Sequence, residues 1–204
     1  MPTAEQILAS LRQVANDAFA LAVAWHVTLA ICGVALALGW RPARRNAGLL
    51  LTLLAVSVSA VSWLHHNPFN AATFALLSVV LAMLALSLGR EAISFRAPGW
   101  ALVLGAAMVA FGSLYPHFLE RSALSYLYGA PTGLIPCPTL SLMVGASLLV
   151  GGLHSRAWSM TLALAGVFYA VWGAMHLGVY IDLVLLAGSL GLLVMRPHLQ
   201  SHSY

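Results

Sequence analysis

The chain alternates between long apolar runs and short polar connections along almost its whole length. Seven such runs cover residues 19–40, 47–64, 71–88, 99–119, 132–152, 157–174 and 179–195. Each is near the length that an α-helix needs to cross about 30 Å of hydrocarbon, since a helix rises about 1.5 Å per residue. The pattern predicts an all-α integral membrane bundle of seven transmembrane helices in a single domain, 1–204.

The division between the last two runs is the least marked. The stretch 157–195 is too long for one span, and polar residues between His176 and Asp182 interrupt it. Six spans are therefore the alternative to seven. With six, both termini would lie on one side, and an arginine-bearing loop or tail would face outward, which the usual distribution of cationic residues disfavours.

Residues 1–16 carry apolar side chains at helical spacing, with polar side chains between them. This pattern is typical of an amphipathic helix lying on the membrane interface, and it also suits the opening turns of the first span. The segment lacks the basic stretch, apolar core and cleavage site of a signal peptide. We therefore expect the first apolar run to remain in the mature protein.

Composition supports a lipid environment. Of the 204 residues, 61% are hydrophobic and 7% are charged, whereas a soluble domain has roughly a quarter of its residues charged. The lipid bilayer is thus the expected partner of most of the surface. The formal net charge of +4 comes from arginines placed between apolar runs, a pattern that indicates membrane topology and argues against nucleic-acid binding.

The arginines fall on alternate connections. After the first, third, fifth and seventh runs stand Arg41, Arg44 and Arg45, then Arg90 and Arg96, then Arg156, then Arg196. Cationic residues near span ends are retained on the cytoplasmic side. The sequence therefore predicts an outside N-terminus, a short cytoplasmic tail at 196–204, and a place in the bacterial cytoplasmic (inner) membrane.

Ionisable side chains gather near the predicted outer face. With this topology His65, His66, His117 and His176 lie at span ends, and Asp182 and Cys137 lie slightly deeper. His26 is expected nearer the middle of the membrane. Ionisable groups are costly to bury in lipid, so those found there are functional candidates.

The sharpest functional hypothesis is an outward-facing site for a transition metal or another cofactor. Imidazole and carboxylate groups suit metal binding, so His66, His117, His176 and Asp182 are the predicted ligands, with Cys137 beneath. A haem between two facing histidines is a variant. The alternative is that histidines at helix ends sit in the headgroup region without touching, and no HxxxH or HExxH spacing argues otherwise.

Two prolines, Pro136 and Pro138, bracket Cys137 inside an apolar run. Proline obstructs the helical hydrogen bond, and a broken membrane helix of this kind lines ion and substrate sites in transporters. Equally, both prolines are tolerated in the first turn of a helix. Both readings remain open, and Cys32 and Cys137, each within an apolar run, predict no disulfide framework.

One short motif, Pro136-Cys137-Pro138-Thr139, is followed about forty residues later by Gly178 to Asp182 and by Leu185 to Gly188. With these segments the chain resembles a family of bacterial multi-span membrane proteins that is classified only as a domain of unknown function. The resemblance covers mainly residues 128–193. It implies a bacterial membrane protein and supplies no activity, but it makes Cys137 and Asp182 parts of one pattern.

Four functions compete at this point. They are the outward-facing metal or cofactor site, a small-solute or ion transporter with its site at Pro136–Pro138, an accessory subunit of a membrane complex, and a zinc-dependent intramembrane hydrolase. Whether the protein is an enzyme, which partner it has and whether it forms a homo-oligomer are not decided by the residues.

Overall fold

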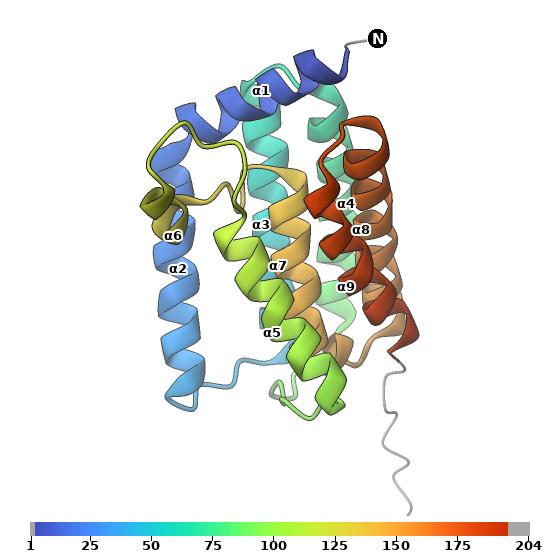
Figure 1. The fold of residues 1–204 in the computed structure, drawn as a ribbon. Coiled ribbons are helices and arrows are strands. Elements are labelled where there is room, and N and C mark those ends of the chain that lie inside the picture. The colour runs from blue at the N-terminus through green and yellow to red at the C-terminus, as the bar shows by residue number, and fades with distance from the viewer. Residues whose placement is uncertain (1–2, 196–204) are drawn as a thin grey trace, which may run out of the picture.

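The computed structural model describes residues 3–195, and their regular structure is helical (Figure 1). One helix crosses the end of a bundle that is formed by the longer helices. In chain order the helices are α1 (Ala4–Asp17), α2 (Phe19–Ala37), α3 (Arg44–Leu64), α4 (Pro68–Ser87), α5 (Gly99–Leu114), α6 (Tyr126–Gly129), α7 (Pro136–Leu149), α8 (Arg156–His176) and α9 (Leu183–Val194), with short 3-10 turns η1 (Ala123–Ser125), η2 (Gly151–His154) and η3 (Tyr180–Asp182).

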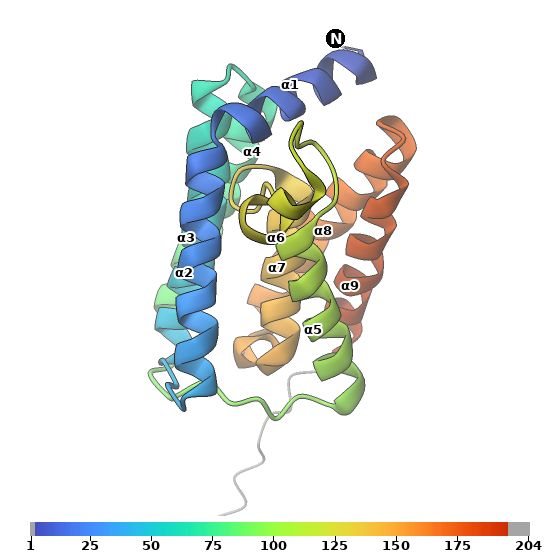
Figure 2. The same cartoon turned by 60° about the vertical axis from the view of Figure 1, so that its left-hand side comes forward.

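Successive long helices run in opposite directions along the bundle, as Figures 1 and 2 show. One end, which we call the α1 end, carries α1, the α3–α4 turn, the segment between α5 and α7, and the α8–α9 connection. The opposite end, which we call the arginine end, carries the α2–α3, α4–α5 and α7–α8 connections. Because the direction alternates, residues far apart in sequence meet at the same end.

Each of the seven predicted apolar runs overlaps one of these longer helices, and α3, α4 and α8 begin one to three residues before their runs. Four of the helices, namely α2, α3, α4 and α8, are long and apolar enough to cross a membrane. The segments 99–114, 136–149 and 180–194 form shorter apolar helices. The all-helical bundle is therefore confirmed, and four of its helices fit a membrane protein by length and composition, whereas the number of spans and the orientation stay predictions.

Two predicted runs are shortened at their ends, for local reasons. The helix α5 ends at Leu114, before Pro116, because proline disfavours helical conformation in the residue before it. The helix α7 begins at Pro136 and ends before Gly151 and Gly152, which both adopt a φ of 64°. A left-handed φ suits glycine and terminates a helix.

The N-terminal segment forms a helix of its own instead of extending the first span. The helix α1 ends at Asp17, and Ala18 leaves the helical conformation before α2 starts. A capping box at Thr3 and Gln6 begins α1, and Leu11, Val14 and Ala15 are buried on its inner face. Its amphipathic pattern is thus explained by packing across the bundle end, with its polar face turned away.

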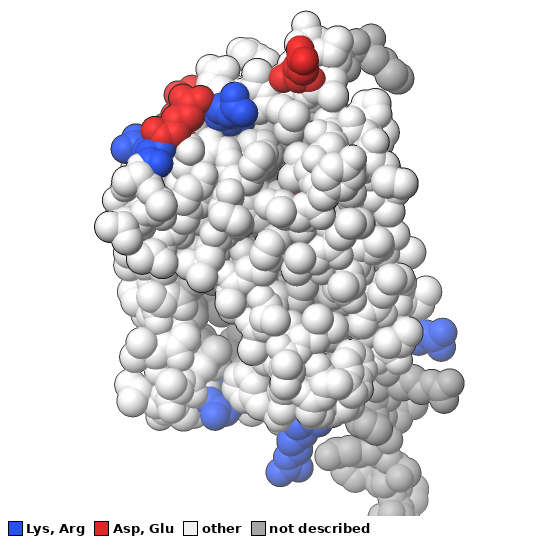
Figure 3. Space-filling view, in the orientation of Figure 1, with Lys and Arg blue, Asp and Glu red and all other residues white. Residues whose placement is uncertain are grey.

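The middle of the bundle presents apolar side chains to the outside. Among the exposed large hydrophobic residues are Ile31, Leu53, Leu76, Val103 and Leu164. In Figure 3 the visible charged residues lie toward the two ends and leave a broad uncharged band between them. Exposing an apolar surface of this extent to water is unfavourable in free energy, whereas contact with lipid hydrocarbon is not.

Close backbone contact joins α5 to α7. A Cβ atom added at Gly112 would lie 2.6 Å from the Pro138 carbonyl oxygen, and one added at Gly145 would lie 2.7 Å from the Gly105 carbonyl oxygen. Small residues allow such approach, which is typical of helix pairs in membranes. This contact fixes the start of α7, and therefore Cys137, relative to the end of α5.

A candidate site beneath helix α1

A pocket of about 530 Å³ lies at the α1 end, directly beneath α1. Its roof is formed by Gln6, Ile7, Ser10 and Leu11 of α1. The α3–α4 turn, the first turn of α7, the last turns of α8 and the segment leading to α9 complete its walls and floor. We call this cavity the α1 pocket.

A buried carboxylate forms part of the pocket lining. This carboxylate belongs to Asp182 of η3, a residue that is 2% exposed. The Tyr115 hydroxyl donates a hydrogen bond of 2.6 Å to Asp182 Oδ1, although the two residues are 67 positions apart. Cys137, at the start of α7, lines the same pocket. The end of α5, the start of α7 and η3 therefore meet at this pocket.

The second carboxylate oxygen lies against a glycine. A Cβ atom added at Gly173 of α8 would stand 2.0 Å from Asp182 Oδ2. Two atoms cannot lie that close without a bond between them. A residue larger than glycine would therefore displace the carboxylate. The identity of residue 173 is thus explained by the position of Asp182.

A second polar pair lies in the same pocket. The Tyr169 hydroxyl donates to Asn70 Oδ1 over 3.1 Å, and both side chains are buried. The Cys137 thiol approaches the Tyr169 carbonyl oxygen at 4.0 Å, the outer limit for sulfur. These contacts hold the pocket face of α4 and α8 in register with the start of α7.

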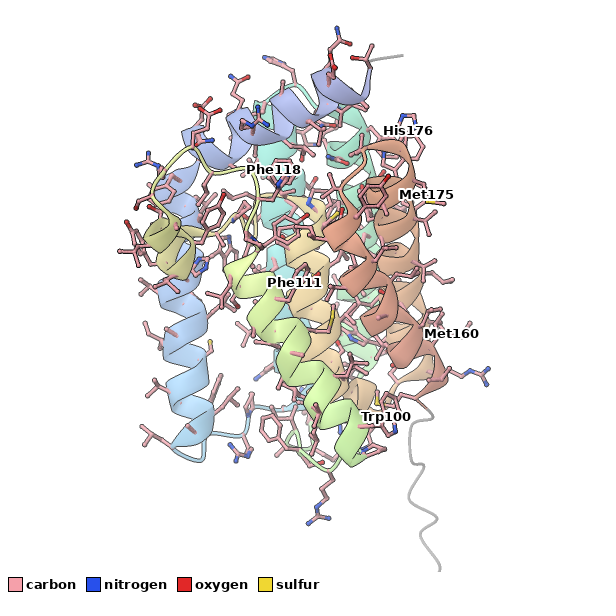
Figure 4. All side chains as sticks on the ribbon, in the orientation of Figure 1. Trp100, Phe111, Phe118, Met160, Met175 and His176 are labelled. Carbon is pink, nitrogen blue, oxygen red and sulfur yellow. The ribbon has the colours of Figure 1, made fainter. Side chains whose placement is uncertain are left out.

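Aromatic rings form much of the remaining wall. The Trp172 ring is stacked on Phe69, with centroids 6.4 Å apart and planes inclined by 28°. The His176 ring lies 4.2 Å from Trp172 at the end of α8, and Figure 4 places His176 near the top of the bundle. Phe118 closes the side beneath α1. The pocket is therefore an aromatic enclosure with one acid in its lining.

The described pocket lining carries an acidic side chain without a permanent positive charge to balance it. Among the described residues that line the α1 pocket, Asp182 is the sole carboxylate, and no arginine or lysine accompanies it. A buried carboxylate is normally paired with a cation or held by several hydrogen-bond donors. Here the Tyr115 hydroxyl is the donor that the structure gives to the carboxylate, so a cationic group has a place to bind.

The structure brings together part of the predicted site. His66, His176, Cys137 and Asp182 all line the α1 pocket, as does Pro136. His66 and His176 are exposed at its rim, whereas Asp182 is buried. His66 lies in the turn before α4 and has a φ of 54°. Because of this left-handed conformation, the chain does not continue the helical path that ends at His65.

The other predicted residues lie elsewhere. His65 Nδ1 stands 3.9 Å from Asp17 Oδ2 at the end of α1. His117 packs edge-on against Phe118 with centroids 4.3 Å apart, and burial, together with the nearby Arg12, lowers the pKa of its imidazole. His26 is hydrogen-bonded inside the bundle, with Nδ1 2.9 Å from the Ala22 oxygen and Nε2 2.8 Å from the Ser113 oxygen.

The predicted metal ligands do not form a coordination group. Within residues 3–195, no three His, Cys, Asp or Glu side chains are arranged to hold a metal ion. The reason is geometric, because His117 lies outside the α1 pocket, whereas His66 and His176 are exposed at its rim and Asp182 is buried. A metal centre built on His66, His117, His176 and Asp182 therefore gains no support from the fold.

The two prolines begin a helix and do not break one. Pro136 and Pro138 lie in the first turn of α7, where the missing N–H groups would have had no helical partner. Thr139 Oγ1 accepts a hydrogen bond of 2.8 Å from the Gly133 N–H, and this bond ties the preceding non-helical segment to the helix. Of the two interpretations that the sequence left open, the start of a helix is confirmed, and an interruption at Pro136–Pro138 is not.

Sequence reasoning missed Tyr115, Tyr169, Asn70 and Trp172 as members of the site. Asn70 was detectable as an amide directly before an apolar run, and Tyr115 as a polar aromatic residue next to Pro116. Tyrosine and tryptophan near span ends are common membrane-interface residues. Their presence alone therefore gave no reason to group them with Asp182.

No family model, curated protein or solved structure matches this chain. The resemblance based on residues 136–139 and 178–188 stays a prediction.

Proposed function

We propose that this chain is a seven-span protein of the bacterial cytoplasmic membrane that binds a small organic cation in the α1 pocket, from the outer side. The observation that carries the proposal is the buried Asp182 carboxylate in an aromatic pocket without a cationic neighbour. Burying an ion without a partner is costly, so a ligand that supplies the positive charge would be stabilised there.

The distribution of charge supports the outward orientation. Among the described residues, the arginine end carries Arg41, Arg44, Arg45, Arg90, Arg96 and Arg156, with Glu91 as its acid. The α1 end carries Arg12 and Arg121 together with Glu5, Asp17 and Glu120. Because cationic loops are retained in the cytoplasm, the arginine end is the inner end and the pocket opens outward.

The aromatic walls support a cationic ligand over an anionic or neutral one. Trp172, Tyr169, Phe69 and Phe118 all line the cavity. The face of an aromatic ring attracts a cation, and quaternary ammonium groups are bound in this way. One carboxylate and several rings are the usual components of such a site, and neither favours an anion.

The interior supports binding from one side over passage through the bundle. Below the α1 pocket, toward the arginine end, the core is filled by fully buried apolar residues that include Met108, Leu140, Met143 and Leu148. A transport pathway needs polar groups in both halves of the membrane. The proposed role is therefore that of a receptor or binding site for an external solute.

The test compares choline with 3,3-dimethyl-1-butanol, its uncharged analogue of the same shape, on detergent-purified protein. Choline is expected to raise the unfolding temperature of the wild type and of Glu120→Gln, an acid at the same end outside the pocket. Asp182→Asn should remove the effect, and the uncharged analogue should have none.

Equal stabilisation by both compounds, or by choline in Asp182→Asn, would refute the proposal. If Zn²⁺ stabilised the wild type at equimolar concentration while choline did not, the metal-site hypothesis would replace it. Folding of each variant is checked by its helical circular dichroism before ligand is added.

A further inference from the structure

A second cavity lies between α2 and the rest of the bundle. It has a volume of about 690 Å³, within the range of about 300–1,000 Å³ that is usual for ligand sites. Its walls come from α2, α3, α5 and α7 and are almost entirely apolar; they include Leu29, Gly33, Leu36, Leu54, Leu142 and Leu149. We call this cavity the α2 groove.

Helix α2 is fastened to the bundle in the half near the α1 end. The Trp25 indole N–H donates to Ser57 Oγ over 2.9 Å, and His26 Nε2 lies 2.8 Å from the Ser113 oxygen. Phe19 packs edge-on against Tyr128 of α6 at 6.0 Å. In this half the helix has direct partners from α3, α5 and α6.

The other half of α2 has no comparable attachment. From Val27 to Ala37, the described side chains make no hydrogen bond to another helix, and Ala22 is the sole buried residue of α2. Gly33 has no atom within 4 Å of the position that a Cβ would occupy. Figure 1 shows α2 standing apart from the neighbouring helices along this length. The groove is therefore an open apolar slot facing the hydrocarbon.

The mouth of the groove at the arginine end carries positive charge. Trp40, Pro42 and Phe95 line this mouth, and the Arg41 guanidinium lies over the Phe95 ring at 5.1 Å from its centroid. The Arg41 Nη1 atom donates to the Trp40 carbonyl oxygen over 2.8 Å, while the residue stays exposed. A guanidinium has five N–H donors, so several remain for an anion.

From this combination we infer that the α2 groove holds one acyl chain of an anionic phospholipid, whose phosphate is bound by Arg41. The groove accepts a hydrocarbon chain because its walls are apolar. Arg41 lies at the end of the bundle, where the lipid headgroup would be. Basic pockets between membrane helices on the cytoplasmic side bind lipid headgroups in this way. The inference goes beyond the α1 pocket and needs only that the bundle spans a membrane.

The test counts lipids that stay bound after gentle extraction. The protein is reconstituted in vesicles of equal parts phosphatidylglycerol and phosphatidylcholine, extracted in mild detergent and examined by native mass spectrometry. One phosphatidylglycerol per chain is expected on the wild type. Arg41→Gln should lower its occupancy several-fold, and Gly33→Leu, which places a side chain in the open slot, should lower it as strongly.

The matched control is Arg156→Gln, which removes an exposed arginine at the same end but away from the groove, and it should keep wild-type occupancy. Equal retention of the two lipids, or retention of phosphatidylglycerol by Gly33→Leu, would overturn the inference. So would a lipid-free dimer, because a helix of a second copy would then fill the groove. Arg41 is exposed, so its variant remains informative even if the Gly33 variant folds poorly.

Discussion

Asp182 depends on small and specific neighbours, and the consequences can be tested one residue at a time. Its two carboxylate oxygens face different partners, the Tyr115 hydroxyl and the Gly173 backbone. A substitution at either position has a distinct effect, because Tyr115 supplies the hydrogen-bond donor and Gly173 leaves room for the carboxylate. Both therefore give sharp predictions at single positions.

Gly173→Ala is expected to displace the Asp182 carboxylate, because the added Cβ would stand 2.0 Å from Oδ2. Forcing an atom into a filled core costs roughly 1–3 kcal/mol, so the free energy of unfolding in detergent should fall by that amount and choline stabilisation should be lost. Gly33→Ala, at an open helical position, should not lower the free energy of unfolding and should leave the choline response unchanged. A fully stable Gly173→Ala protein that still responds to choline would contradict the geometry.

Tyr115→Phe removes the donor to Asp182 Oδ1 and leaves the aromatic packing in place. A buried acceptor that loses its partner costs about 1–3 kcal/mol, and a loss of that size should appear in denaturant unfolding. Tyr128→Phe is the control, since Tyr128 is half exposed. In the double variant with Asp182→Asn the two losses should be less than additive, and strict additivity would mean that the pair does not interact.

His117 gives a prediction about pH. Burial and the nearby Arg12 lower the pKa of its imidazole in the folded state from the ordinary value of 6.5. The unfolded chain therefore binds more protons just below that value, and folding stability should fall as the pH drops from 6.5 downwards. Burial also lowers the pKa of His154, with Arg44 contributing.

The measurement is the free energy of unfolding against pH for the wild type, His117→Gln, His154→Gln and the double variant. Each single variant should flatten part of the slope below pH 6.5, and the double variant should flatten most of it. An unchanged slope in the double variant would mean that other groups govern the acid sensitivity.

At the scale of whole elements, α1 has the role of a roof. It contacts the bundle through its apolar face, and Asn16 fastens it to the segment after α5. Asn16 Nδ2 donates to the Phe118 oxygen and Asn16 Oδ1 accepts from the Glu120 N–H, each over 3.0 Å. The exposed pair Arg12–Glu120 at 3.8 Å adds little, as surface ion pairs do. Two hydrogen bonds at one residue thus hold the roof in place.

Asn16→Ala is expected to loosen α1 and open the α1 pocket. In a Cys32→Ser background, a small methanethiosulfonate reagent should then modify Cys137, which lines the pocket, several-fold faster than before. Gln13→Ala is the control because Gln13 bonds to Asp17 within the same helix. If both variants react at the parent rate, α1 does not limit access to the pocket.

At the scale of the molecule, charge and direction of the helices set the orientation in the membrane. The α1 end should face outward and the arginine end inward. A Ser122→Cys variant, without the two native cysteines, should react with a membrane-impermeant maleimide in intact cells. An Asn46→Cys variant in the same background should react after the membrane is permeabilised. The reverse pattern would invert the topology and place the α1 pocket on the cytoplasmic side.

The sequence by itself determined the class of the molecule, because that depends on local composition. Apolar runs of span length can be stable as helices in lipid with all backbone bonds satisfied internally, so the bundle and the helix within each run could be read from the chain. The amphipathic pattern of residues 1–16 and the alternation of arginines are equally local. Segment ends were less readable, and Pro116 and Pro136 show that single prolines moved them by several residues.

Tertiary structure alone decided which polar groups meet. Tyr115 and Asp182 are 67 positions apart, and Tyr169 and Asn70 are 99 apart, so no spacing rule along the chain relates them. Depth in the membrane placed His66, His117, His176 and Asp182 near one end, but depth says nothing of the direction in which a side chain points around its helix. Packing sets that direction: it left His117 outside the α1 pocket, against Phe118, and it buried Asp182 beside Gly173.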